Sequence, residues 1–507
     1  MAELDGRSLT LAQVVAVARR HETVSLAPSA IPGIDAARDF VDRTLAAGDV
    51  VYGLSTGFGK FSDRTIPAAD TAILQRNLIL SHACALGEPL PAEVVRAVML
   101  LRANALCHGH SGIRRATLQL LLDALNAGVH PVIPSQGSLG ASGDLEPLSH
   151  MALVLIGEGE AEYRGERFPG GEAMRRAGLK AVDLAAKEGL ALINGTQVMT
   201  AIGALAAYDA RRLCAVADVA AALTCEALTG ITAAFDEKVH ELRPHPGQRA
   251  SAANLRRLLA GSRLALPSQP GRVQDAYSLR CAPQVHGACR DAVEYAAATV
   301  ERELDAVTDN PLVFPATGEA ISGGNFHGEP VALALDFLGI ALAELADISE
   351  RRTERLVNPA LSNGLPAFLS SNGGVNSGFM VTQYAAASLV SENKVWSHPA
   401  SVDSIPSSAN QEDHVSMGTT AARKARTILG NAEKVLAIEL LCAVQAAGMR
   451  GAEGLSPAGR AVFGRLREDI PPVREDVAMY PLMEAAEGLV RSGAVLAAAE
   501  SACGPLL

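Results

Sequence analysis

Aromatic residues and positive charge are both scarce in this sequence. Phe, Trp and Tyr make up only 4% of the 507 residues, and there is one tryptophan in the whole chain. Alanine and leucine supply much of the hydrophobic content instead, which favours packed helices over sheets. The formal net charge of −11 argues against nucleic-acid binding, which needs a basic surface, but it is compatible with a small zwitterionic substrate.

Long hydrophobic runs and a signal sequence are also missing. Asp336, Glu344 and Glu439 interrupt the longest apolar stretches before these could span a bilayer. No basic N-terminal stretch precedes an apolar core, so the sequence predicts no signal peptide. We therefore expect a soluble, cytoplasmic protein that does not contact a membrane.

The spacing of the cysteines argues against a zinc site and against a disulfide framework. The eight cysteines are scattered and no C-x-x-C pair occurs, so most of them are expected to be buried thiols. The segment from Cys107 to His110 holds one cysteine and two histidines, but no second ligand pair follows at zinc-finger spacing. The sequence therefore predicts no metal site.

The pattern of apolar residues predicts a mainly helical, all-α fold with two domains. Residues 1–195 mix short helical patterns with loops rich in Gly and Pro, and residues 196–507 carry long alanine-rich helical patterns. Long helices are expected over residues 335–356, over residues 293–307 (stopped by Asn310-Pro311) and over residues 417–448. No stretch alternates at period two for long enough to require a sheet. We expect an N-terminal catalytic domain (1–195) and a long-helix bundle (196–507).

The segment from Gly137 to Ser149 contains a run of very small residues, Ala141-Ser142-Gly143. Because Gly143 has no Cβ, its amide nitrogen can fold back to bonding distance from the Ala141 carbonyl carbon. Closing that five-membered ring and removing water from Ser142 would leave a methylidene group conjugated to a ring carbonyl. Such an electrophile suits the deamination of amino acids. The alternative for this segment alone is a Gly/Ser loop that leads into a helix.

This segment resembles the aromatic amino acid ammonia-lyase family, whose prosthetic group is methylidene-imidazolone (MIO). The resemblance extends in register from about Tyr52 to His414. It implies that Ala141, Ser142 and Gly143 form MIO, that Asp144 supports it, and that no exogenous cofactor is needed. It also implies a homotetramer in which each active site draws on three subunits. A helix expected to begin at Asp144 would place its partial positive charge at MIO.

A second motif of the family lies at Tyr52 to Gly59. In these lyases the equivalent tyrosine removes the substrate β-proton, so Tyr52 is the expected base. A phenol titrates near pH 10, so it would need a cationic or hydrogen-bonding environment to act near neutrality. The same segment contains Gly53-x-Ser55-x-Gly57, a formal match to a hydrolase nucleophile elbow. That motif requires a helix directly after it, which Gly57-Phe58-Gly59 does not favour.

Two further positions resemble the histidine branch of the family. Ser81-His82 occurs where lyases acting on phenylalanine or tyrosine carry a different pair, and Gln411-Glu412 replaces their Gln-Asp. His82 is expected to hydrogen-bond a substrate imidazole, and Glu412 to accept its N–H or assist proton removal. The alternatives are a structural histidine and a carboxylate at a helix N-terminus.

The remaining candidate residues are assigned by resemblance. Asn194 is expected near MIO and the polar end of the substrate, and Phe326 against MIO or the substrate ring. Gln274, Tyr277 and Arg280 recur at steps of three and can share one face. Arg280 would bind the substrate carboxylate with its planar fork, and the other two would hold MIO. The alternatives are a turn asparagine before Gly195 and a surface Arg paired with Asp275.

The reaction implied by the resemblance is conversion of L-histidine to trans-urocanate and ammonia. Three alternatives stay open at this point. They are a lyase acting on tyrosine or phenylalanine, an MIO aminomutase that gives a β-amino acid, and a non-catalytic helical assembly protein.

Overall fold

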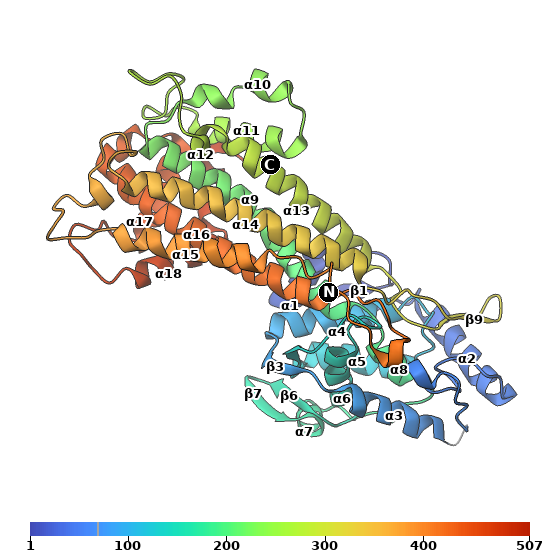
Figure 1. Cartoon of the computed structure of the whole chain (residues 1–507). Coiled ribbons are helices and arrows are strands. Elements are labelled where there is room, and N and C mark those ends of the chain that lie inside the picture. The colour runs from blue at the N-terminus through green and yellow to red at the C-terminus, as the bar shows by residue number, and fades with distance from the viewer. Residues whose placement is uncertain (68–69) are drawn as a thin grey trace. The chain divides into compact units, whose positions relative to one another are not determined.

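Helices make up most of the structure, as the alanine- and leucine-rich composition predicts. A computed structural model describes residues 1–67 and 70–507, and these hold helices α1 to α19 with short strands between them (Figure 1). The chain divides into two compact units, each built from three segments of the sequence. The predicted mainly helical fold is confirmed.

The first unit comprises Met1–Tyr208, Ala296–Asp336 and Pro399–Arg423. Its helices are α1 (Leu11–Arg19), α2 (Ile31–Ala47), α3 (Thr71–His82), α4 (Ala92–Leu106), α5 (Arg115–Ala127), α6 (Leu145–Leu155), α7 (Gly170–Arg176), α8 (Glu188–Ile193) and the start of α9 (Gln197–Ala227). Helix α4 forms much of its core, because nearly every side chain from Val94 to Leu106 is buried. The sequence predicted a single domain boundary at residue 195. The first unit instead continues to Tyr208 and also includes residues 296–336 and 399–423.

The strands of the first unit are short and pair locally. They are β1 (Ala2–Leu4) with β2 (Val24–Leu26) in parallel, and the antiparallel sets β3 (Leu86–Pro89) with β5 (Pro134–Gln136), β4 (Val129–Pro131) with β6 (Glu160–Tyr163) and β7 (Glu166–Pro169), and β8 (Leu312–Phe314) with β9 (Glu319–Ile321). Strands of three or four residues pin loops in place without forming a layer of the fold.

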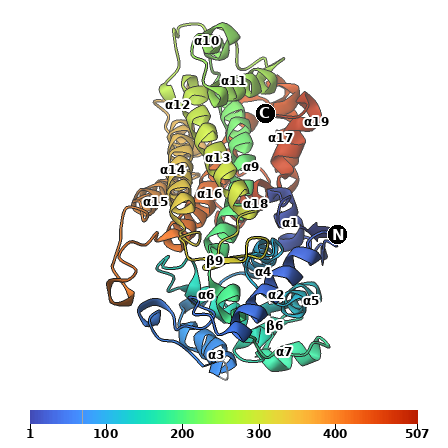
Figure 2. The same cartoon turned by 90° about the vertical axis from the view of Figure 1, so that its right-hand side faces the viewer.

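The second unit comprises Asp209–Tyr295, Phe337–His398 and Lys424–Leu507. Besides the rest of α9 it holds α10 (Glu237–Glu241), α11 (Pro246–Leu259), α12 (Tyr277–Arg280), α15 (Met380–Trp396), α17 (Pro457–Asp469), α18 (Tyr480–Ser492), α19 (Ala494–Cys503) and most of α13 (Ala282–Leu304), α14 (Glu329–Val357) and α16 (Gly418–Arg450). Its long helices run side by side as a bundle (Figure 2).

The long helices agree with the apolar periodicity except at one end. Helix α14 covers the pattern over 335–356, and α16 covers 417–448. Leu335, Leu338 and Leu342 are fully buried, as expected for one face of an amphipathic helix. Helix α13 ends at Leu304, so Val307 lies outside the helix that the pattern predicted. The apolar spacing there continues into a loop, where period alone cannot distinguish a last turn from an extended segment.

The structure shows the length and hydropathy of the helices and the state of the cysteines. Within the described residues, no helix is both long and apolar enough to cross a membrane. All eight cysteines are free, and five of them are buried. His108 and His110 contact the carbonyl oxygens of Asp305 and Val313 at 2.9 and 2.8 Å.

Candidate active site

A cavity of 790 Å³ in the first unit brings together four of the residues singled out in the sequence. They are Tyr52, His82, Ser142 and Glu412. These side chains come from the loop before α3, the last turn of α3, the loop before α6 and the loop before α16. The cavity is also lined by Gly57, Phe58, Gly59, Lys60, Phe61, Arg64, Ile66, Leu74, Asn77, Leu78, Ser81, Leu145, Leu190, Ser408 and Ala409. Most of the lining is apolar, with a few polar groups converging on one space, which is typical of a small-molecule site.

The backbone of the Ala141-Ser142-Gly143 tripeptide is tightly folded. Ser142 and Gly143 both have positive φ angles, 51° and 78°. A Cβ added at Gly143 would lie 2.2 Å from the carbonyl oxygen of Gly195, a separation that real Cβ atoms do not reach. The Asp144 N–H donates to that same oxygen at 2.7 Å. Only glycine fits at position 143, both for its conformation and for this close approach.

Asp144 is fully buried and ties the tripeptide to two helices. Its Oδ2 accepts the N–H groups of Val198 and Met199, each at 2.9 Å, in the first turn of α9. Its Oδ1 accepts the hydroxyl of Ser138 at 2.9 Å and that of Thr419, in the first turn of α16. Burial raises the pKa of Asp144, and these hydrogen bonds oppose the rise. The carboxylate therefore caps α9 rather than α6, the helix that it precedes.

Replacing Asp144 by Asn should destabilise this loop strongly. An amide NH₂ would face donors that now point at a carboxylate oxygen, which leaves buried N–H or O–H groups unpaired. We expect a loss of about 2–4 kcal/mol in the free energy of unfolding, measured by denaturant titration. Asp123→Asn is the control and should change stability little, because the Asp123 carboxylate accepts from the Gln119 amide four residues earlier in α5 and no other bond to it is seen among the described residues. Equal stability of the two variants would contradict this role of Asp144.

The loop that carries Tyr52 is held by its own hydrogen bonds. The Tyr52 hydroxyl accepts the Gly59 N–H at 3.3 Å. Burial raises the pKa of Tyr52, and the negative charge of Glu412 raises it further, while the Gly59 bond lowers it. Ser55, the formal hydrolase nucleophile, donates to the Asp49 carbonyl at 2.8 Å, and the next α-helix of the described chain starts at Thr71. The elbow geometry that a hydrolase needs is therefore absent from this described segment.

His82 and Glu412 lie on the wall of the cavity and interact electrostatically. Burial lowers the pKa of His82, whereas the charge of Glu412 raises it. The imidazole Nδ1 is 3.0 Å from the Ser81 hydroxyl. The Glu412 Oε2 accepts the Ser407 hydroxyl at 3.1 Å, and the two backbones pair with each other across the intervening turn. A neutral imidazole and a carboxylate can together donate to and accept from a ring with both kinds of nitrogen.

Asn194 ends α8 and presents an unused acceptor. Its amide Nδ2 donates to the Asn310 carbonyl at 3.0 Å, and its Oδ1 is buried without a partner among the described residues. A buried amide oxygen left unpaired is costly, so such a group is a candidate to accept an N–H from a ligand. Its neighbour Gly195 pairs with Gly143 of the tripeptide.

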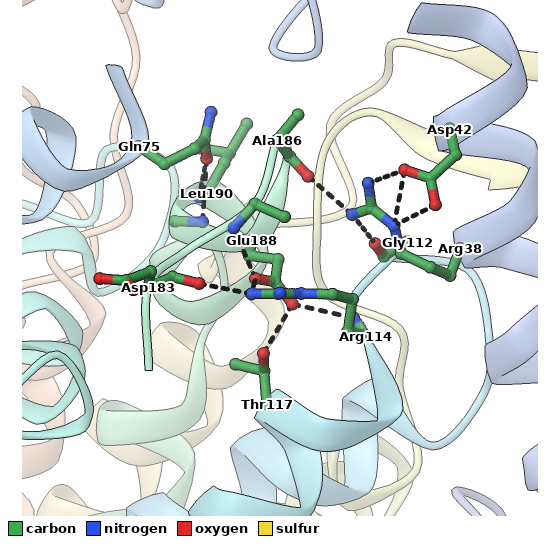
Figure 3. Close-up of polar contacts among 12 residues, drawn as sticks. Arg38, Asp42, Gln75, Gly112, Arg114, Thr117, Asp183, Ala186, Glu188 and Leu190 are labelled. Carbon is green, nitrogen blue, oxygen red and sulfur yellow. Dashed lines mark hydrogen bonds and ion pairs between the residues drawn. The ribbon is translucent and has the colours of Figure 1, made fainter. Parts of the chain in front are cut away.

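A polar network that the sequence motifs do not indicate holds the start of α8 (Figure 3). The Gln75 Oε1 on α3 accepts the N–H groups of Gly189 and Leu190 at 2.9 and 3.3 Å. The fully buried Glu188 carboxylate accepts from Arg114 Nη2 at 2.5 Å and from the Thr117 hydroxyl at 2.7 Å. No spacing in the sequence signals these pairs, because the partners are separated by 71 to 115 residues. The network fixes α8 against α3, the two helices that carry the cavity-lining residues Leu190 and His82.

The other predicted site residues do not line this cavity. Gln274, Tyr277 and Arg280 belong to the second unit, where the Arg280 guanidinium lies 4.6 Å from the centre of the Tyr277 ring. The expected shared face is only partly formed, because α12 begins at Tyr277 and leaves Gln274 outside it. Asp275 forms an ion pair with Arg272 at 2.9 Å. Phe326, in the first unit, is half-buried in the loop before α14.

Comparison with known proteins identifies the family. The family model for aromatic amino acid lyases matches residues 9–468. The chain belongs to this family. It is 61% identical to a histidine ammonia-lyase of Symbiobacterium thermophilum, over 99% of both chains. Its structure resembles that of a histidine ammonia-lyase from Trypanosoma cruzi, with 45% identity, a TM-score of 0.92, and coverage of 99% of this chain and 95% of that one. A tyrosine aminomutase from Streptomyces globisporus is 37% identical with a TM-score of 0.94, and the match covers 99% of this chain and 98% of that one.

The lyases of this family depend in general on MIO, and the residues here fit that group. Position 143 accommodates only glycine, Ser142 lies on the cavity wall, and the buried Asn194 Oδ1 is unpaired. Membership in this family confirms the resemblance found in the sequence.

Proposed function

We propose that the protein is an ammonia-lyase that converts L-histidine to trans-urocanate and ammonia. The observation that carries this proposal is the presence of His82 and Glu412 on the same cavity wall as Tyr52 and Ser142. The two groups form a polar end that suits an imidazole. The 61% identity to a histidine ammonia-lyase over nearly the full chain supports the same substrate.

We further propose that Ala141, Ser142 and Gly143 form MIO. Ring closure joins the Gly143 nitrogen to the Ala141 carbonyl carbon and expels its oxygen as water, with one hydrogen from each of the Ser142 and Gly143 amides. The Ser142 side chain leaves as a second water with its α-hydrogen, which creates the methylidene carbon. MIO would supply an electrophilic carbon that activates the amino acid toward loss of ammonia. Asp144 and Gly195 would hold the ring in place.

The remaining roles follow from the chemistry of the side chains. Tyr52 would remove the β-proton of the substrate, and Asn194 would accept an N–H of its amino group with Oδ1. Because burial and Glu412 raise the pKa of Tyr52, a cation brought in with the substrate or by another subunit would be needed to favour the phenolate. His82 and Glu412 would hold the imidazole on opposite ring nitrogens.

Glu412→Gln should lower turnover of histidine far more than it lowers stability. The amide loses the charge that orients the substrate N–H, so we expect kcat/KM to fall by about 10²-fold. The Glu412 carboxylate is bonded to the Ser407 hydroxyl, and an amide oxygen can accept that bond as well. Steady-state kinetics measure the loss of turnover, and a thermal melt measures the loss of stability. Parallel losses of activity and stability would indicate a structural carboxylate.

Gln274, Tyr277 and Arg280 are proposed to serve the active site of another subunit in a homotetramer. Tyr277 is 70% exposed, and the Arg280 Nε is buried without a partner among the described residues. Helices α14 and α15 expose large apolar side chains in the second unit, including Phe337, Tyr384 and Trp396. Soluble monomers rarely expose such surfaces, so they support self-association. In such an assembly Arg280 would bind the substrate carboxylate across a subunit interface. Light scattering measures the number of subunits in the assembly.

Assaying three amino acids separates the candidate activities. Histidine should give an absorbing unsaturated acid and ammonia, whereas phenylalanine and tyrosine should react much more slowly. An aminomutase, favoured by the likeness to tyrosine aminomutase structures, would instead give a β-amino acid. A non-catalytic assembly protein would show no product and an intact mass without dehydration.

Phe326 is proposed to contact the substrate ring or MIO.

A further inference from the structure

Arg102 lies in α4 and is fully buried, but it belongs to no motif of the sequence. Its Nη1 donates to the Asn194 carbonyl at 2.8 Å, to the Gln197 Oε1 at 2.9 Å and to the Thr308 carbonyl at 3.2 Å. Its Nε and Nη2 have no partner among the described residues. Burial lowers its pKa to about 10, and Asp309 opposes the shift, so the group stays charged at neutral pH. A buried cation with unpaired donors costs stability, so stability alone does not explain its presence.

The guanidinium fixes the peptide group between Asn194 and Gly195. A Cβ at Gly195 would lie 2.6 Å from Nη1, so the α-carbon of this glycine rests directly against the cation. The Asn194 carbonyl points to Arg102, and the following carbonyl, that of Gly195, accepts the Asp144 N–H at 2.7 Å. Arg102 is therefore linked through one residue, Gly195, to the backbone N–H that follows the tripeptide.

The Gly195 carbonyl, next along the chain, packs against the residue whose nitrogen must attack. Gly143 pairs with Gly195, and a Cβ at Gly143 would lie 2.2 Å from the Gly195 oxygen. Ring closure needs the Gly143 nitrogen to approach the Ala141 carbonyl carbon. A rigid wall behind Gly143 excludes backbone conformations in which these two atoms are apart, which raises their effective concentration.

Helix α8 is held firmly at its other end as well. The Lys187 ammonium donates to the Asp309 Oδ2 at 2.8 Å, and both side chains are fully buried. Gln75 binds the first N–H groups of the helix (Figure 3). Because both ends of α8 are fixed, a change at Arg102 is not absorbed by movement of the whole helix and should act locally, on the Asn194–Gly195 peptide.

We propose that Arg102 is a positioning residue for MIO formation, because it fixes the Asn194–Gly195 peptide and so positions the next carbonyl, that of Gly195, which lies against Gly143. The inference rests on the proposed function, since it requires that the tripeptide cyclises. Arg102 touches neither substrate nor reacting atoms in this role; it acts through Gly195.

The test follows dehydration of the tripeptide by mass, without an activity assay. Full-length wild type, Arg102→Lys and Arg102→Met are made by cell-free synthesis, and samples are denatured at intervals for intact-mass measurement. Arg96→Lys and Arg96→Met are the matched controls. Arg96 lies on the same helix, is buried, and donates to the Val17 and Leu125 carbonyls at 3.0 Å, away from the tripeptide. Circular dichroism and a thermal melt report folding of each variant.

The rates of water loss in the variants and in the wild type test the inference and the proposed function separately. We expect wild type and the Arg96 variants to lose two waters, and the folded Arg102 variants to do so at least about tenfold more slowly. Folded Arg102→Lys that dehydrates at the wild-type rate would overturn the inference but leave the proposed function intact. Wild type that never loses water would overturn the proposed function itself. If Arg102→Met fails to fold, the lysine variant decides, because it keeps the buried cation and shortens only its reach.

Discussion

Ser142→Ala is expected to abolish turnover of histidine while the protein still folds. Without the Ser142 hydroxyl the methylidene carbon cannot form, so a loss of about 10³-fold or more in kcat is expected, as for other groups that bond covalently to the substrate. Ser142 already has a φ of 51°, and alanine pays a similar cost of about 1–2 kcal/mol there. Turnover of histidine, a thermal melt and the intact mass together measure the effect.

A matched control lies in the same segment. Ser149 is buried in α6, its hydroxyl donates to the Leu145 carbonyl at 2.7 Å, and it is not one of the residues that line the cavity. Ser149→Ala should therefore keep both the dehydrated mass and the activity. Full activity in Ser142→Ala would refute the assignment of MIO to this tripeptide.

Tyr52→Phe is expected to lower kcat by about 10²–10⁴-fold, the usual contribution of a positioned base. The fold should persist, because the ring stays in place and only the Gly59 N–H loses an acceptor at 3.3 Å. KM should change much less than kcat, since in the proposed role the phenolate acts in proton removal. Tyr163→Phe, on β6 beside Arg164, is the control and should behave as wild type. A large rise in KM with unchanged kcat would make Tyr52 a binding residue instead.

The same role predicts how activity depends on pH. In the proposed role the phenolate is the active form. Because burial together with Glu412 raises the pKa of Tyr52, kcat/KM should climb as pH rises above neutral. Removing the negative charge in Glu412→Gln should move this rise in kcat/KM to lower pH. Glu146, whose pKa burial raises to about 7, titrates earlier. A rise in kcat/KM above neutral pH that persists in Glu146→Gln is therefore assigned to Tyr52. A value of kcat/KM that does not change above neutral pH would contradict the role of Tyr52 as the base.

The sequence predicted the helices and the local motifs well where each depends on neighbouring residues. The apolar steps over 335–356 required one helix, and α14 covers them. Ser142, Tyr52, His82 and Glu412 were chosen from short motifs, and one cavity holds all four. The end of α13 at Leu304 was missed, because apolar spacing continues to Val307 beyond the last helical turn.

The partners that hold the tripeptide could not be predicted. Asp144 binds Thr419, which lies 275 residues later, and Arg102 binds the carbonyls of Asn194 and Thr308. Such contacts have no repeating pattern in the sequence, because any residue with a suitable donor can bond to a backbone carbonyl once the chain is folded. The unpaired Asn194 Oδ1 and the buried Arg102 cation became visible only with their surroundings.

The amino-acid sequence by itself determined the helical class and the run of small residues that we propose forms MIO, because both depend on residues close together in the chain. The tertiary structure decided which groups surround that tripeptide: a glycine carbonyl in contact with Gly143, a carboxylate that caps α9, and a buried guanidinium behind Gly195. Close packing of distant segments sets these separations to fractions of an ångström, and no local pattern in a sequence encodes a distance of that kind.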